Sequence, residues 1–261
     1  TAAVGVPFLI FTLVVRGWFA GFVIVALTFI AMYENYRALK KAGYVVCEWG
    51  GYVATAAMWP LSRLMGVLDP LLLLVAAMGV SMTGVMLHEK PAFPDAAASV
   101  YPLLTCFLPM SMFMMMMNST YGVVPGIALI TMAFAIAYAG DGAAYFGGRA
   151  MGKHKLCPNV SPKKTVEGAI GGVIGGAVLV LLAALIMNAT LKLGLPLWAA
   201  VVLGACGAVL GEIGDLSFSI IKRQTGIKDY GHIFPGHGGV MDRFDSVIFT
   251  LIVMYCYTLV L

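Results

Sequence analysis

The chain has 261 residues, of which 61% are hydrophobic and only 11% are charged, and its formal net charge is +4. Soluble globular domains are typically about 45–50% apolar and about 25% charged. With a mean hydropathy of +0.95, the sequence excludes a soluble globular fold, a disordered chain and a nucleic-acid-binding domain. We expect an all-α, polytopic integral membrane protein that has no nucleic-acid partner.

Apolar runs along the chain predict the membrane spans. A helix that crosses a bilayer needs about 20 mainly apolar residues, and lipid does not tolerate exposed irregular backbone. The sequence therefore predicts about nine transmembrane helices, of which the first is short. The expected spans cover residues 2–15, 18–36, 51–67, 70–88, 99–118, 121–140, 167–191, 196–221 and 244–261.

The basic residues predict the sidedness of these spans. If Arg37, Lys40 and Lys41 are cytoplasmic, strict alternation places the loops 141–166 and 222–243 on the same side. Cytoplasmic loops are enriched in lysine and arginine, and this arrangement concentrates the basic residues there. We expect a cytoplasmic amino terminus, and only three basic residues fall on the outer side: Arg16, Arg63 and Lys192.

Ionisable residues divide the chain into two functional regions. In the second half they gather in 141–167 and 212–245. We expect residues 121–261 to form a catalytic membrane region. Residues 1–120 are expected to form a scaffold of membrane helices that provides lipid access or dimer contacts.

A polar stripe runs along the expected eighth span. Four polar residues follow one another at intervals of three, four and three, which places them on one face of a helix: Glu212, Asp215, Ser219 and Lys222. A carboxylate within a membrane costs roughly 2.5–3.5 kcal/mol on an insertion scale. Glu212 and Asp215 therefore predict a compensating cation or basic partner.

Asp242 and Asp245 form a second acidic pair at the start of the expected ninth span. Ion pairs with Lys222, Arg223 and Arg243 would account for one or two of the four acids. Four acids at two helix ends on the same side of the membrane favour a hard cation over ion pairs alone, because such cations prefer oxygen ligands.

The segment between these two pairs is rich in glycine. Residues 228–239 contain Gly231, Gly236, Gly238 and Gly239, with basic residues on either side. Backbone amides at glycines can approach an anion closely, so the segment predicts a phosphate cradle. An ordinary glycine-rich surface loop is the alternative.

A second polar segment covers residues 141–167. It begins at Asp141, a third candidate acid, and matches neither a Walker A loop nor a Rossmann turn. Its charge suits a polyphosphate, although Lys153 to Lys155 could instead touch anionic lipid headgroups. The basic residues of this segment are Arg149, Lys153, Lys155, Lys163 and Lys164.

A motif with fixed spacing occupies residues 219–245. It consists of Ser219, Lys222-Arg223, Lys228-Asp229, Pro235-x-His237-Gly238-Gly239 and Asp242-Arg243-x-Asp245. This motif resembles the signature of the phosphatidate cytidylyltransferase family, also called CDP-diacylglycerol synthases. The stretches 161–168 and 211–215 resemble that family as well, whereas the first 120 residues match it only in hydrophobic character.

The resemblance implies an activity. CTP and phosphatidate would be converted to CDP-diacylglycerol and pyrophosphate, with Mg²⁺ as cofactor and a second cation left open. It also implies an all-helical, homodimeric protein in the bacterial inner membrane whose active site faces the cytoplasm.

The resemblance also implies roles for individual residues. Asp215 and Asp242 are the expected magnesium ligands, with Glu212, Asp245 and Asp141 as further ligands. The catalytic set is completed by residues that hold phosphate groups: Lys222, Arg223, Lys228 and His237. The expected substrate contacts are Arg243 for the phosphatidate headgroup and, for CTP, Lys153, Lys155, Ser161, Lys163, Lys164 and Thr165.

Other functions would also use acids and basic loops in a membrane. A CTP-dependent polyprenol or phytol kinase has similar helices and loops, but its acceptor is a lipid alcohol. A cation transporter would place acids within membrane helices, yet it does not explain the motif at 235–239. A CDP-alcohol phosphotransferase is set aside, because the sequence around Asp141 lacks that family's Ala-Arg and later aspartates.

Overall fold

The structure is a computed structural model, and it describes residues 11–15, 17–62, 69–118, 126–233 and 238–260. The chain forms two compact units. Unit 1 comprises Thr1–Asn118 and Ile221–Phe244, and unit 2 comprises Ser119–Ile220 and Asp245–Leu261. The expected division into an amino-terminal scaffold and a carboxyl-terminal catalytic region stays a prediction.

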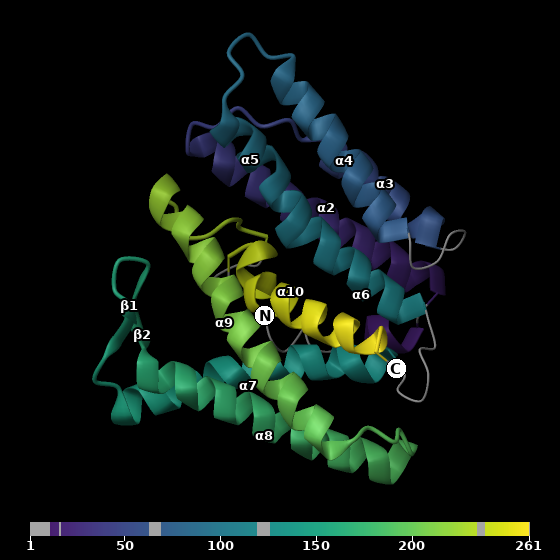
Figure 1. The fold of residues 1–261 in the computed structure, drawn as a ribbon, viewed down its shortest axis with the longest axis vertical. Helices are drawn as coiled ribbons and strands as arrows, with labels where there is room; N and C mark the ends of the chain where they lie inside the picture. The colour runs from purple at the N-terminus through teal and green to yellow at the C-terminus, as the bar shows by residue number, and fades with distance from the viewer. Residues whose placement is uncertain (1–10, 16, 63–68, 119–125, 234–237, 261) are drawn as a thin grey trace. The chain divides into compact units, whose positions relative to one another are not determined.

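The amino-terminal part of unit 1 consists of helices joined by loops. Its first helices are α2 (Gly17–Lys41), α3 (Trp49–Ser62) and α4 (Asp69–Met86). Next come α5 (Phe93–Pro102), the π-helical turn η2 (Leu103–Phe107) and α6 (Leu108–Asn118), which form one continuous rod in Figure 1. The change of hydrogen-bond register follows Pro102, which has no amide hydrogen to donate to the preceding turn.

Unit 2 consists of long helices and one hairpin. Its elements are α7 (Gly126–Met151), β1 (Lys155–Cys157), β2 (Ser161–Thr165), α8 (Val166–Leu191), α9 (Leu197–Thr225) and α10 (Met241–Thr258). The end of α9 and the first turn of α10 belong to unit 1. The strands pair antiparallel, and Thr165 ends β2 and caps α8 by accepting a hydrogen bond from the Gly168 amide at 3.1 Å.

Glycines on one face of α8 allow its backbone to lie close to neighbouring helices. A Cβ at Gly168 would lie 2.8 Å from the Ala144 carbonyl of α7, and one at Gly172 would lie 3.2 Å from the Ala144 side chain. A Cβ at Gly176 would lie 2.9 Å from Ala208 of α9. This stripe of glycines therefore serves close packing between helices.

The opposite face of α8 is apolar and exposed. A stripe of large side chains follows the helical repeat: Ile170, Ile174, Val178, Leu182 and Ile186. Among the described residues, five helical segments are long and apolar enough to cross a membrane, namely α2, Phe93–Met117, α7, α8 and α9. An exposed apolar face on such a helix contacts lipid, and the chain is a polytopic integral membrane protein.

The prediction of nine spans is not confirmed. Helix α3 has 14 residues, which at about 1.5 Å per residue fall short of a hydrocarbon core about 30 Å thick. The apolar part of α4 is also short, and α10 carries Asp242, Arg243 and Asp245 in its first turns. The expected span at 2–15 lies mostly outside the described residues, and the predicted sidedness stays a prediction.

The expected loop 141–166 is largely ordered secondary structure. Helix α7 continues through Met151, and the β1–β2 hairpin extends from the adjoining ends of α7 and α8 (Figure 1). Asp141 and Arg149 thus lie within α7 and do not end it, and Asp141 lines a polar pocket there.

Candidate active site

Unit 2 places a lysine between two carboxylates. Lys164 of β2 lies with its Nζ 2.8 Å from Glu212 Oε1 and 2.5 Å from Asp215 Oδ2, one turn apart on α9. Burial acts to lower the pKa of Lys164, but the two carboxylates outweigh it and the pKa is raised. The ammonium therefore stays charged, and the basic partner that the acidic stripe predicted is Lys164.

These side chains open onto a pocket of about 380 Å³ within unit 2. Its volume is within the range of small-molecule sites. Acidic groups line it beside basic ones and two glycines, so that it offers contacts for a polyphosphate as well as a cation. The polar and glycine residues of the lining are Asp141, Tyr145, Gly148, Arg149, Lys163, Lys164, Thr165, Gly168, Glu212 and Asp215.

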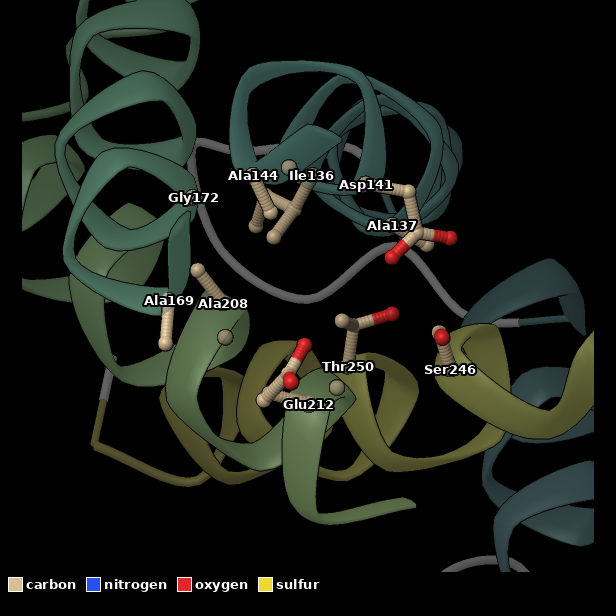
Figure 2. Close-up of a pocket in the computed structure, with 13 residues that line it drawn as sticks. Ile136, Ala137, Asp141, Ala144, Ala169, Gly172, Ala208, Glu212, Ser246 and Thr250 are labelled. Carbon is tan, nitrogen blue, oxygen red and sulfur yellow. The ribbon is translucent and has the colours of Figure 1, made fainter. Parts of the chain in front are cut away.

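A smaller cavity of about 20 Å³ adjoins the same acids. Figure 2 shows Asp141 from α7 and Glu212 from α9 at this cavity together with Ser246 and Thr250 from α10. The Thr250 hydroxyl donates to the Ala133 carbonyl at 3.1 Å. The volume corresponds to one water molecule, and Asp141 and Glu212 line this cavity as well as the larger pocket.

The carboxylates of unit 2 have the chemistry of ligands for a hard cation, but their side chains do not converge on one point in this structure. Asp141, Glu212 and Asp215 line one pocket with oxygen ligands, which Mg²⁺ prefers. In the described part of the chain, however, no three acidic, histidine or cysteine side chains converge as metal ligands. The Lys164 ammonium supplies the positive charge between Glu212 and Asp215 in this structure.

Glu167 accepts hydrogen bonds from the residues that lead into the hairpin that carries Lys164. This carboxylate, in the first turn of α8, accepts hydrogen bonds from the amides of Lys153 at 3.0 Å and His154 at 3.2 Å. Its Oε1 also lies 2.6 Å from His154 Nδ1. The sequence motif included Glu167 without a role, and its contacts show that it positions the hairpin.

The predicted CTP contacts are not all in the same environment. Lys163, Lys164 and Thr165 line the large pocket. Lys155 donates from Nζ to the Pro162 carbonyl at 2.7 Å, within its own hairpin. Lys153 is exposed and Ser161 is half-buried, and both lie outside the pocket lining.

Unit 1 holds the second acidic cluster around Asp242. The Asp242 side chain is only 3% exposed, and its Oδ1 lies 3.2 Å from Lys222 Nζ. Its Oδ2 accepts hydrogen bonds from the amides of Tyr230 at 2.7 Å and Gly239 at 2.9 Å. Lys222 also lies over the Tyr230 ring, with Nζ 5.6 Å from the centroid.

Sequence reasoning missed Glu34 of α2, which lies beside the same segment. It is 2% exposed and accepts hydrogen bonds from the Val240 and Met241 amides. An acid inside the expected span 18–36 was the signal that could have found it.

The expected phosphate cradle is therefore partly occupied by the protein's own acids. Four amides of the described segment donate to Asp242 or Glu34, at residues Tyr230, Gly239, Val240 and Met241. A nearby carboxylate satisfies these donors as an anion would.

The other predicted site residues have varied positions. Arg223, Lys228 and Arg243 are exposed in unit 1. Asp245 belongs to unit 2, where its Oδ1 accepts from the Ser246 amide at 2.9 Å. His237 lies outside the described residues.

Comparison with known proteins identifies the family. The sequence model of the cytidylyltransferase family matches residues 1–261. A Staphylococcus saprophyticus protein named phosphatidate cytidylyltransferase is 44% identical over 126 residues, which are 48% of this chain and 47% of that protein. Proteins of the same name from Haemophilus influenzae and Bacillus subtilis are 42% identical over 122 residues and 40% identical over 130.

These alignments with curated relatives are partial. They cover 47% of this chain and 42% of the Haemophilus protein, and 50% of this chain and 47% of the Bacillus protein. The chain thus spans about half the length of the curated relatives it matches, whereas the family model covers it from end to end. The chain therefore belongs to the cytidylyltransferase family.

Proposed function

We propose that this protein transfers a cytidylyl group from CTP to phosphatidate, which yields CDP-diacylglycerol and pyrophosphate. The observation that carries the proposal is the pocket of unit 2, where Lys163, Lys164 and Thr165 lie with Glu212 and Asp215 around about 380 Å³. Such a pocket suits a nucleotide polyphosphate, and the similar proteins named phosphatidate cytidylyltransferase support the choice of acceptor.

The transfer is a displacement at phosphorus. An oxygen of the phosphatidate phosphate attacks the α-phosphorus of CTP, a new P–O bond forms, and the bond to the pyrophosphate oxygen breaks. Such reactions depend mainly on alignment and on neutralisation of negative charge. In this assignment Lys163 and Lys164 neutralise the CTP phosphates, and the Thr165 hydroxyl orients them.

Magnesium belongs to the proposal as a cofactor. Glu212 and Asp215 would hold it, with Asp141 in the lining of the same pocket, and its charge would neutralise phosphate oxygens. Lys164 would then move from these carboxylates towards the nucleotide. Asp242 and Asp245 stay predicted ligands.

The basic residues of unit 1 are assigned to phosphate groups of the substrates and of the pyrophosphate product. Lys222 lies against Asp242, and Arg223 and Lys228 are exposed nearby in the sequence. Arg243 is assigned to the phosphatidate headgroup. We retain His237 as a phosphate contact on the strength of the motif alone.

The setting of the reaction follows from its substrates. Phosphatidate lies in the bilayer, which the apolar outer faces of the helices contact, and CTP is cytoplasmic. We therefore place the active site at the cytoplasmic face of a bacterial inner membrane. A homodimer is part of the proposal and can be tested by mass measurement in detergent.

A single assay separates the proposed function from its alternatives. Purified protein is incubated with α-labelled or γ-labelled CTP, with phosphatidate or a polyprenol, and with or without Mg²⁺. We expect α-label in a lipid product with phosphatidate and Mg²⁺. Transfer of γ-label to the polyprenol would show a kinase instead, and cation flux in liposomes without CTP would show a transporter.

A further inference from the structure

Glu34 is a buried acid within a membrane helix, and the proposed chemistry does not use it. A buried carboxylate is costly unless it is hydrogen-bonded. Glu34 receives hydrogen bonds from two backbone amides, Val240 N to Oε1 at 3.2 Å and Met241 N to Oε2 at 2.8 Å. Its burial is therefore compensated by the backbone of the signature segment.

The two amides lie at the start of α10, which begins at Met241. The first amides of a helix have no partner within the helix, and negative charge is favourable there. Glu34 serves as the capping group for this helix from a position 206 residues away in the sequence from Val240. The contact fixes where α10 begins relative to α2 within unit 1.

Two glycines of the signature segment pack directly against this carboxylate. A Cβ at Gly231 or at Gly239 would overlap Glu34 Oε1. The segment therefore approaches Glu34 more closely than a chain with side chains at these positions could. Glycine at 231 and 239 is explained by this approach, without a bound phosphate.

Helix α2 holds the segment at both ends. Arg37, one turn beyond Glu34, donates to the Tyr230 carbonyl, while Glu34 accepts from Val240 and Met241. Between these points the amides of Tyr230 and Gly239 donate to Asp242. The position of the Asp242 carboxylate thus depends on the backbone that Glu34 holds.

We propose that Glu34 is a positioning residue for cytidylyl transfer, because it holds the backbone of residues 238–242 in the conformation that orients Asp242, and with it the paired Lys222. The inference rests on the proposed function for its catalytic consequence only. Displacement of reacting groups by about 1 Å can cost about a hundredfold in rate. Loss of the Glu34 contacts should therefore affect turnover more than CTP binding, whose assigned contacts lie in unit 2.

The first test replaces Glu34 by glutamine, which keeps the shape but cannot accept from both amides. We expect faster hydrogen exchange of the peptide that covers 238–242 and a fall in kcat of about tenfold or more, with KM for CTP within about twofold. The control is Glu89→Gln, the same change at an exposed site, and it should alter none of these quantities.

A second variant disturbs the same contact by a change in the signature segment instead of in Glu34, and it leaves the charge unaltered. Gly239→Ala places a methyl group against Glu34, and we expect the same pattern of faster exchange and lower kcat. Gly79→Ala is its control, because a Cβ there meets nothing within 4 Å. In a Glu34→Ala background, Gly239→Ala should add little further loss, since the contact is already gone.

These measurements can overturn the inference in distinct ways. Unchanged exchange at 238–242 in both variants would show that Glu34 does not hold the segment. Faster exchange with unchanged kcat would show that the contact has no part in catalysis. If wild-type protein transfers no cytidylyl group, the proposed function fails, whereas the exchange data still decide whether Glu34 holds the segment. If Glu34→Gln loses its helical circular dichroism, the variant is unfolded. The exchange and kcat of Gly239→Ala then decide whether the inference holds.

Discussion

The two carboxylate clusters of the molecule are held by different kinds of donor. In unit 2, Glu212 and Asp215 pair with the Lys164 side chain, and all three are about one-fifth to one-quarter exposed beside a pocket. In unit 1, Asp242 is 3% exposed and accepts from two backbone amides.

This difference indicates different tasks for the two clusters. A lysine ammonium on a flexible stem can exchange one partner for another, whereas backbone amides are fixed by the fold. The first cluster suits ligand exchange during a reaction. The second suits the maintenance of one backbone conformation.

The largest expected effect is a loss of turnover at Asp215 that leaves the stability of the protein unchanged. Asp215→Asn should lower lipid-dependent CTP turnover by about 10²–10³-fold, because the amide loses the charge that a cation or Lys164 needs. The melting temperature should change by less than about 2 °C, since partly exposed ion pairs contribute little. Turnover assays and fluorescence melting curves in detergent measure both. Near-normal turnover would remove Asp215 from the site.

The second effect concerns Asp242, where we expect a loss of stability as well as turnover. Asp242→Asn replaces one oxygen by a donor that faces either Lys222 or the amides of Tyr230 and Gly239. The free energy of unfolding should fall by about 2–4 kcal/mol. Asp95→Asn is the matched control, because the half-buried Asp95 accepts from a single amide. A melting curve for Asp242→Asn equal to that of wild type would remove the distinction between the clusters.

A smaller effect tests which substrate each cluster serves. Lys164→Ala should raise KM for CTP by about tenfold and change KM for phosphatidate less, while Arg243→Ala should show the opposite bias. Because the pKa of Lys164 is raised, its contribution should be the same at pH 7 and at pH 9. Steady-state kinetics with each substrate varied in turn provide the measurement. Equal shifts in both constants would contradict the assignment.

The smallest effect is expected at the base of the hairpin. Glu167→Gln weakens the hydrogen bonds to the amides of Lys153 and His154, so the hairpin that carries Lys164 becomes more mobile. We expect KM for CTP to rise by about threefold, with little change in the melting temperature. Faster hydrogen exchange at residues 152–165 should accompany the change, and unchanged exchange there would mean that Glu167 does not hold the hairpin.

The sequence alone determined the properties that depend on composition and local spacing. Hydropathy identified a polytopic helical membrane protein, because a bilayer admits few other structures for such a chain. The spacing of Glu212 and Asp215 placed them on one helix face, and in the structure both pair with the same lysine. Fixed spacing in 219–245 was enough to indicate the family that the comparison then showed.

Tertiary structure alone decided which groups satisfy one another. Hydropathy did not settle the number of spans, and it ended α7 too early, because a polar residue inside a helix is tolerated when the fold gives it a polar environment. Glu34 and Val240 are 206 positions apart, and no periodic pattern connects them. Lys164 could have been paired with several acids by charge alone. Only the tertiary fold, which brings the Lys164 side chain of β2 to α9, selected Glu212 and Asp215, since an ion pair depends on distances of a few ångströms that composition and spacing do not specify.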